Sequence, residues 1–320
     1  MWRAVQRHPA GRWLLHPVAI TYLVVALIWI VAGIAKPGFA KFGHLRYLLE
    51  LAAVTGIAAA GQTLVIIAAG IDLSVASTIT FAAIMLPLVT AGWDTVGVLG
   101  VGLVLAITTC VGTINGIGVV LLRVHPLIVT LATATILQGS LLLIAGGSAV
   151  STSNPAVVWL GNGRLFGMPV TILTWIVVAS AILVLLHRSV IGSWLYAIGT
   201  NPRASRLAGV NLPLTLIVAY AISGFSAGLA GLLLLGMNRQ GYVGIGEPYL
   251  LGSIAAVVLG GTSILGGRGT YLGTIAGAIL LVTITALITV VNASPGWRSV
   301  LFGTLIFGLL LLAGREREAG

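Results

Sequence analysis

The sequence predicts an all-α polytopic membrane protein with about ten transmembrane helices. Hydrophobic residues make up 58% of the 320 positions and charged residues only 7%, whereas roughly a quarter of a soluble domain is charged. The mean hydropathy is +1.14. Apolar runs of about 20 residues, the length that crosses a bilayer as a helix, recur along the chain. No hydrophilic stretch is long enough for a soluble catalytic domain, so we expect a single membrane domain over residues 1–320.

The apolar runs give the order of the expected spans. They cover residues 17–35, 47–69, 73–91, 96–122, 126–146, 168–187, 213–236, 250–265, 270–291 and 298–314. The eighth is short, and the sequence leaves the boundaries around 65–75 and 260–272 open. Residues 1–16 carry three arginines, and no small-residue cleavage pattern follows the first span. We therefore expect a short cytoplasmic tract rather than a removed signal peptide.

The charges predict which way the chain crosses the membrane. Cytoplasmic loops carry an excess of Lys and Arg. With the N-terminus inside, ten of the 16 Lys and Arg residues fall in the cytoplasm: Arg3, Arg7, Arg12, Arg123, Arg188, Arg203, Arg206, Arg268, Arg315 and Arg317. An even number of spans then puts both termini inside. The net charge of +10 lies in short loops between apolar spans, so it indicates membrane orientation and not nucleic-acid binding.

Asp72 stands out among the six acidic residues, because it lies in AAGIDLSVAS between two strongly apolar runs. Gly70 can end the preceding helix, and Asp72 or Ser74 can cap the next one. Asp72 is then a plain helix cap at a tight turn. The other interpretation is a helix break that lines a polar cavity, where irregular backbone and a carboxylate are tolerated in a membrane. The sequence leaves both open.

Three amides lie inside apolar spans: Gln62, Asn115 and Gln138. Such groups are costly to bury and usually face a partner helix or a path. With Asp72 and Ser74 they are the candidates for a translocation path. Thr130, Thr133 and Gln138 can share one helical face, although threonines in membrane helices usually bond their own backbone. These neutral groups suit a neutral polyol, and we expect no metal site.

Residues 197–212, AIGTNPRASRLAGVNL, form the only long polar, basic connection inside the chain. Asn201 can cap a short helix with Pro202 at its first position, and Gly209 can end it. Arg203 and Arg206 then share a face. We expect a cytoplasmic partner to contact this unit, which comprises Thr200, Asn201, Pro202, Arg203, Ala204, Ser205, Arg206, Leu207, Ala208 and Gly209.

Glycines at four-residue spacing predict close helix packing. Gly269, Gly273 and Gly277 repeat over the ninth span, and Gly112/Gly116 and Gly224/Gly228 show the same spacing. Such a stripe lets two helix backbones approach. The triplet in the ninth span indicates a seam, either within the chain or with a second copy.

Several chemistries can be set aside. GTSILGG, residues 261–267, has the glycine spacing of a phosphate loop, but Gly267 and Arg268 stand where Lys and Ser or Thr are required. The chain contains no HExxH or CxxC motif, and its one cysteine, Cys110, lies in an apolar run. We therefore expect no cofactor in this chain and no catalytic residue.

Three segments resemble the signatures of bacterial sugar-importer permeases of the ribose, xylose and autoinducer-2 type, in the branched-chain amino-acid/ribose permease superfamily. They are GIDLSV (70–75), AIGTNPRASRLAGVN (197–211) and IAAVVLGGTSILGGRGTYLGTIAGA (254–278). The resemblance runs from about residue 45 to residue 312. It departs before residue 254, where many such permeases carry a Glu-Leu-Asp-Ala type sequence. Here Glu247 is followed by Pro-Tyr-Leu-Leu-Gly-Ser, which puts the particular sugar in doubt.

The resemblance implies the ten-helix, type II permease fold of vitamin-B12-type importers in the bacterial inner membrane. It implies a cytoplasmic ATPase that holds the ATP and magnesium, a periplasmic or lipoprotein sugar-binding protein, and a second permease copy or paralogue. Residues 197–212 would then couple to the ATPase. Two alternatives stay open: the same fold carrying branched-chain amino acids or nucleosides, and a secondary transporter driven by an ion gradient.

Overall fold

The computed structural model describes residues 17–36, 38–90 and 97–290, with scattered positions at 294, 296–297, 300, 303–304 and 307. The expected N-terminal tract 1–16 lies outside the described residues. So does the tenth expected span, 298–314, apart from those scattered positions.

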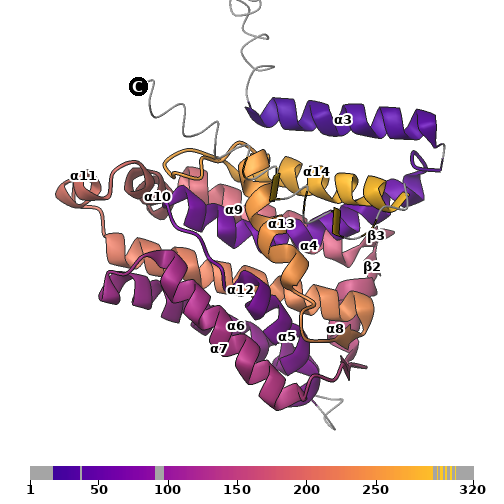
Figure 1. The fold of residues 1–320 in the computed structure, drawn as a ribbon, viewed down its shortest axis with the longest axis horizontal. Coiled ribbons are helices and arrows are strands. Elements are labelled where there is room, and N and C mark those ends of the chain that lie inside the picture. Colours follow the sequence, from indigo (N-terminus) through magenta and orange to yellow (C-terminus); the bar gives the residue numbers. More distant parts are fainter. Residues whose placement is uncertain are drawn as a thin grey trace, which may run out of the picture.

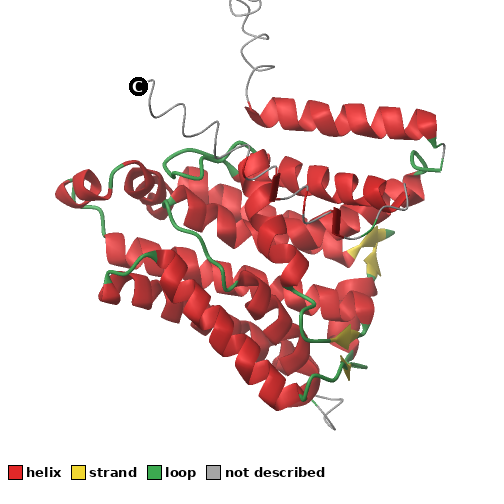
Figure 2. Ribbon diagram, in the orientation of Figure 1, coloured by secondary structure: helices red, strands yellow, loops and turns green. Residues whose placement is uncertain are grey.

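The described chain is almost entirely helical (Figures 1 and 2). The helices are α3 Pro17–Ala35, α4 Phe42–Ile67, α5 Val75–Val89, α6 Gly97–Leu122, α7 Pro126–Ala145, α8 Pro155–Asn162, α9 Val170–Arg188, α10 Val190–Thr200, α11 Pro202–Leu207, α12 Leu212–Asn238, α13 Glu247–Leu259 and α14 Tyr271–Val290. The two-residue strands are β1 Val150–Ser151, β2 Arg164–Leu165, β3 Met168–Pro169 and β4 Gln240–Gly241. β1 pairs antiparallel with β4, and β2 with β3.

Seven described helices, α3, α4, α6, α7, α9, α12 and α14, are long and apolar enough to cross a membrane. They correspond to seven of the expected spans and confirm a multi-pass membrane protein. The expected spans 73–91 and 250–265 are wrong in their lengths. α5 has 15 residues and α13 has 13, which at 1.5 Å per residue gives about 20 Å each. Since the bilayer core is about 30 Å thick, neither helix spans it alone.

The two short helices begin beside each other in the interior. The amide of Gly246, at the start of α13, donates a 3.1 Å hydrogen bond to Thr80 Oγ1 of α5. A Cβ on Gly246 would collide with the carbonyl oxygen of Ala76. From this point the two helices run in opposite directions. α13 ends before Gly260, which packs on Gly273 at the start of α14. α5 ends near Leu86 and Thr90, which pack on Gly100 at the start of α6. Paired broken helices of this kind mark binding sites in many transporters.

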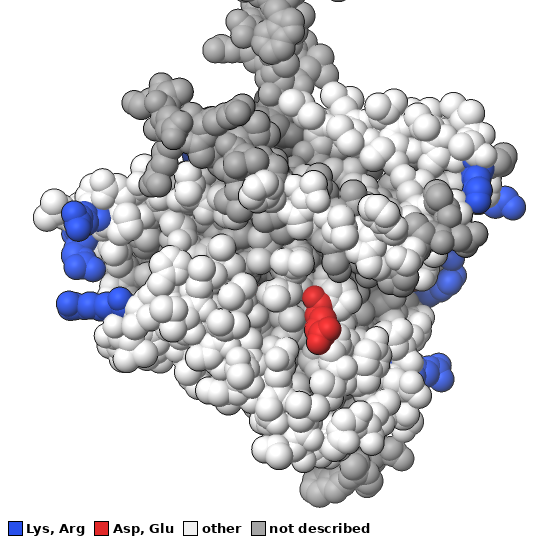
Figure 3. Space-filling model, in the orientation of Figure 1, with Lys and Arg blue, Asp and Glu red and all other residues white. Residues whose placement is uncertain are grey.

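The molecule has two distinct ends (Figure 1). α10 and α11 lie at one end, which we call the α10–α11 end. α8 and all four strands lie at the other, the α8 end (Figure 2). In the view of Figure 3 the Lys and Arg side chains gather toward these two ends, and the face between them is mostly uncharged, with a small acidic patch. An apolar belt between two basic ends is the pattern expected of a membrane-embedded bundle.

α4 and α12 form the centre of the bundle, and small residues set their contacts. Gly61 of α4 lies against the backbone of Ser223 in α12. Gly112 of α6 and Gly224 of α12 face each other so closely that a Cβ on either would collide with the backbone opposite. The expected small-residue contact is thus realised between α6 and α12, within one chain.

The predicted seam of the ninth span is also intramolecular. Gly273 lies against the carbonyl of Gly260, and Gly277 lies against that of Ala256 in α13. Gly269 does not belong to this stripe, because α14 begins at Tyr271. Gly269 is a loop residue with a φ of 146°, beside Thr262.

Candidate functional site

Residues 68–74 form the break between α4 and α5, and Asp72 lies within it. Two residues after the end of α4, Ala69 adopts the left-handed region, at a φ of 61°. The amide of Gly70 returns to the carbonyl of Val65 at 2.9 Å. A Cβ on Gly70 would lie 2.7 Å from the hydroxyl of Tyr220. Because the chain turns this tightly, residues 70–72 leave helical geometry, and Gly70 and Asp72 are buried inside the bundle.

The carboxylate of Asp72 is 1% exposed and accepts three hydrogen bonds. Oδ1 accepts from the amide of Ser74 at 2.9 Å and from its hydroxyl at 2.6 Å. Oδ2 accepts from Ser223 Oγ of α12 at 2.7 Å. No Lys, Arg or His of the described chain pairs with this carboxylate, since the one ion pair found there joins Arg46 and Glu50. Hydroxyl and amide donors therefore take the place of a counter-ion.

Two further side chains extend this contact to α6 and α7. Asn115 Nδ2 donates to Ser74 Oγ at 2.9 Å. Thr133 Oγ1 donates to Asn115 Oδ1 at 2.6 Å. We call these five residues, Asp72, Ser74, Asn115, Thr133 and Ser223, the Asp72 network. It ties the α4–α5 break to three helices at once.

Thr130 of α7 holds the backbone of the same break. Its Oγ1 accepts a 3.1 Å hydrogen bond from the amide of Leu73, and lies 3.0 Å from the carbonyl of Pro126, to which it donates. A shift of α7 relative to α12 would thus stretch bonds to the break from both sides.

The structure brings together three of the five path candidates. Asp72, Ser74 and Asn115 are members of the network. Gln62 is fully buried in α4, and neither Nε2 nor Oε1 has a hydrogen-bond partner among the described residues. Gln138 is exposed on α7, whereas Thr130 is buried and Thr133 is partly buried.

Asp72 is not the N-cap of α5, which is Ser74, and that residue makes no capping bond with its own side chain. Asp72 instead accepts from the amide of the N-cap residue. The sequence does not predict Ser223 as a member of the network, because a lone serine in an apolar helix has no distinguishing pattern. Its position beside Gly224, in a small-residue contact, was the available clue.

The helix within residues 197–212 has the expected caps. Asn201 Oδ1 accepts from the amides of Arg203 and Ala204, both at 3.0 Å, and Pro202 is the first residue of α11. At the other end Gly209 adopts a φ of 82°, and the amide of Val210 returns to the carbonyl of Ser205 at 3.0 Å. This is the Schellman geometry that glycine favours.

The expected extent of the connection is wrong at its start. Residues 197–200 are not part of a polar loop, because they form the last turn of α10, which Ser189 caps by accepting from the amide of Gly192 at 3.0 Å. α11 projects from the bundle, with Arg203 and Arg206 exposed. Leu207 is 91% exposed, whereas Ser205 is buried and donates to the carbonyl of Asn201.

α10 rests on the end of α4. A Cβ on Gly199 would collide with the carbonyl oxygen of Ile67 and with the amide of Gly267. Tyr196 Oη donates a 2.8 Å hydrogen bond to the carbonyl of Gly269. Since Ile67 is the last residue of α4, α10 touches the bundle directly before the break that leads to Asp72.

Residues 45–310 match the protein family described as branched-chain amino acid transport system / permease component. The ribose import permease protein RbsC of Escherichia coli is 31% identical over 316 residues, which cover 98% of each chain. The fructose import permease protein FrcC of Rhizobium meliloti is 32% identical over 300 residues, covering 91% of this chain and 83% of that protein. The L-arabinose transport system permease protein AraH of Escherichia coli is 31% identical over 303 residues, 93% of this chain and 90% of that protein. No solved structure matches the chain.

Proposed function

Because this chain belongs to the family of branched-chain amino acid transport system permease components, we propose that it is the membrane subunit of an ATP-driven importer that carries a sugar across the bacterial inner membrane. One observation carries the proposal: permeases named for ribose, fructose and L-arabinose match the chain over 91% or more of its length. The proposal includes the type II permease fold over a single domain, in which the short helices α5 and α13 stand where two of the ten spans were expected.

The chemistry of the buried polar groups favours a sugar over an amino acid. The amides and hydroxyls of the Asp72 network are neutral, and its single carboxylate already accepts three hydrogen bonds. A zwitterionic amino acid needs charges of both signs along its route, whereas a sugar needs only hydrogen-bond donors and acceptors. Branched-chain amino acids and nucleosides are the alternative cargo.

In the proposed assembly the chain contacts three protein partners and lipid. A cytoplasmic ATPase, which holds the ATP and magnesium, docks on α11. A periplasmic or lipoprotein sugar-binding protein delivers its cargo at the α8 end. A second permease copy or paralogue completes the route, and lipid covers the remaining apolar faces. This places both termini and α11 in the cytoplasm, and the chain itself is not an enzyme. The exposed Leu207, which follows the exposed Arg203 and Arg206, supports α11 as the docking element.

The geometry suggests how ATP could act on the route. Closure of the ATPase would push α11, and α10 would pass the displacement to the carbonyl of Ile67, on which Gly199 packs. The break at 68–74 would then move relative to α12, and the Asp72–Ser223 bond would break or re-form. The ATPase can bias such an equilibrium only through contacts that differ between the two states.

Deletion and complementation in the native host test the proposal. Cells that lack this chain should lose uptake of one labelled pentose or hexose, and the restored gene should recover it together with co-purification of the ATPase. Loss of leucine uptake with unchanged sugar uptake would refute the sugar assignment. Uptake that persists without the ATPase, driven by an ion gradient, would favour a secondary transporter.

A further inference from the structure

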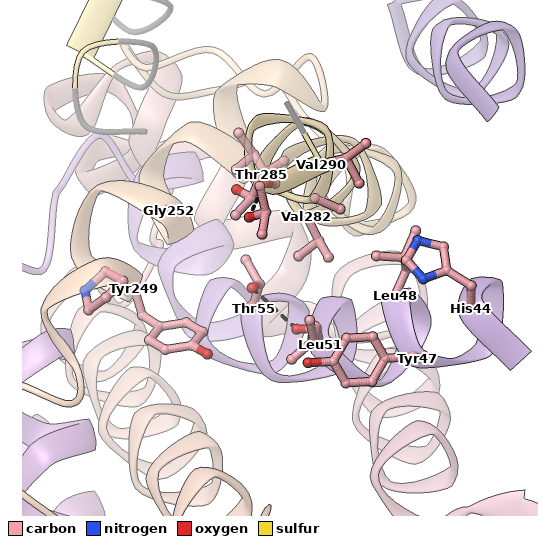
Figure 4. A pocket seen from close by; sticks show the side chains of 14 residues that line it. His44, Tyr47, Leu48, Leu51, Thr55, Tyr249, Gly252, Val282, Thr285 and Val290 are labelled. Carbon is pink, nitrogen blue, oxygen red and sulfur yellow. Dashed lines mark hydrogen bonds between the residues drawn. The ribbon is translucent and has the colours of Figure 1, made fainter. Parts of the chain in front are cut away.

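A cavity of about 350 Å³ lies between α4, α13 and α14 (Figure 4). Its lining comes from the first half of α4, the first turns of α13 and the last turns of α14. It therefore lies toward the α8 end, away from α10 and α11. Ligand sites in proteins occupy about 300–1,000 Å³ and combine apolar walls with a few polar groups.

Six side chains give the cavity its polar and aromatic character: His44, Tyr47, Thr55, Tyr249, Thr285 and Thr289. His44 and Tyr47 lie at one side and Tyr249 at the other (Figure 4). His44 Nε2 is buried and has no hydrogen-bond partner among the described residues. Unsatisfied buried groups of this kind are rare in folded proteins, and each calls for a ligand or another explanation.

The threonines offer acceptors. Thr55 Oγ1 donates to the carbonyl of Leu51 at 3.4 Å, and Thr289 Oγ1 donates to that of Thr285 at 3.1 Å. A hydroxyl that already donates its hydrogen in this way still has lone pairs, which can accept a hydrogen bond from a ligand. The faces of Tyr47 and Tyr249 add broad apolar walls, against which the C–H face of a sugar ring can pack.

None of the described residues that line the cavity is Lys, Arg, Asp or Glu. The ammonium and carboxylate of an amino acid would find no counter-charge there, and burying them unpaired is expensive. A neutral polyol has a small desolvation cost there, because each of its hydroxyls can bond to an acceptor or stay hydrated. We infer that this cavity is a sugar-binding station within the chain, occupied after the sugar enters from the α8 end. This inference rests on the proposed function and names the place where the sugar binds.

Cysteine protection tests the station. Thr285→Cys in a Cys110→Ala background, purified in nanodiscs, is labelled with a small thiol reagent in the presence of ribose, fructose, L-arabinose or L-leucine. Ser153→Cys, at an exposed position in the loop between β1 and α8 that does not line the cavity, is the matched control. At a sugar concentration of about ten times Kd, labelling of Thr285→Cys should slow about tenfold, because only the unoccupied fraction reacts. The control should not slow.

A second variant separates the station from the function as a whole. Thr285→Trp fills the cavity and should abolish sugar uptake while the ATPase still co-purifies. If the unmodified chain imports sugar with ATP, yet no sugar protects Thr285→Cys and Thr285→Trp transports normally, the station is wrong and the function stands. Protection by L-leucine alone would overturn the station as a sugar site. Failure of the unmodified chain to import any sugar would overturn the proposed function and this inference together.

Discussion

The amide of Gly267 donates a 2.9 Å hydrogen bond to the carbonyl of Ile67, the last residue of α4. Gly199 of α10 packs against the same carbonyl. One backbone group therefore joins α10, the turn before α14, and the break that leads to Asp72. Under the proposed function, this joint is the contact through which a displacement of α11 would reach the break that holds Asp72.

Gly199→Ala tests the joint. A methyl group there collides with the Ile67 carbonyl, and overpacking of this kind costs about 1–3 kcal/mol. We expect fewer sugar molecules imported per ATP hydrolysed in proteoliposomes. Gly102→Ala is the control, because a Cβ at Gly102 of α6 meets nothing within 4 Å. An unchanged ratio of sugar imported to ATP hydrolysed in Gly199→Ala would show that α10 does not transmit the ATPase-driven displacement through Ile67.

Asp72→Asn and Asp72→Leu separate the geometry of the network from its charge. The asparagine keeps an acceptor for Ser74 and gains a donor that Ser223 Oγ can accept, so the fold should survive. Asp72→Leu leaves the donors of Ser74 and Ser223 without an acceptor, and each unsatisfied group destabilises the fold by about 1–3 kcal/mol. The variant should therefore have a lower thermal midpoint in detergent. Asp72→Asn that folds normally but does not transport would assign a function to the charge. A fully active Asp72→Leu variant would remove Asp72 from both roles.

Ser223→Ala tests the long-range bond of the network alone. It leaves Asp72 Oδ2 without its donor, so thermal stability should fall by about 1–3 kcal/mol. Ser180→Ala is the matched control, because Ser180 bonds only the carbonyl of Ile176 and lies exposed on α9. Equal thermal midpoints for the two variants would mean that the Asp72–Ser223 bond contributes nothing to stability.

The orientation of the chain in the membrane can be determined by labelling single exposed cysteines in a Cys110→Ala background. Ser205 is a poor reporter because it is buried, but Leu207 is 91% and Phe166 96% exposed. Phe166→Cys, at the α8 end, should react with a membrane-impermeant thiol reagent in intact cells. Leu207→Cys should react only after the cells are opened. The reverse pattern would place α11 outside and exclude its contact with a cytoplasmic ATPase.

Leu207→Ala tests ATPase docking on α11. Its side chain is exposed in the free chain, so folding should be unaffected. If docking buries it, the loss is about 2 kcal/mol, or roughly thirtyfold in Kd for the ATPase. Leu143→Ala, 88% exposed on α7, provides the comparison and should bind normally. Arg203→Lys and Arg206→Lys keep the charge but lose the planar fork, so weaker binding by these variants would indicate direct contacts.

α11 could be predicted residue by residue because its signals are local: Asn201 before Pro202, and Gly209 beyond its end. The sequence predicts α5 and α13 to be longer than they are, because the apolar run continues beyond the backbone turn that ends each helix, as at Gly260. α10 was missed because it is short, although the capping Ser189 marked its start. The Asp72 network joins residues that are up to 151 positions apart, and such contacts arise from tertiary packing that no local pattern encodes.

The most direct test of the whole account is uptake by proteoliposomes that contain this chain, its ATPase and its binding protein. We predict that labelled ribose, fructose, L-arabinose or a related sugar accumulates with ATP on the ATPase side, and not with a non-hydrolysable analogue. Unlabelled leucine should not compete. Accumulation of leucine instead of any sugar, or accumulation of sugar without ATP under an imposed ion gradient, would contradict the account.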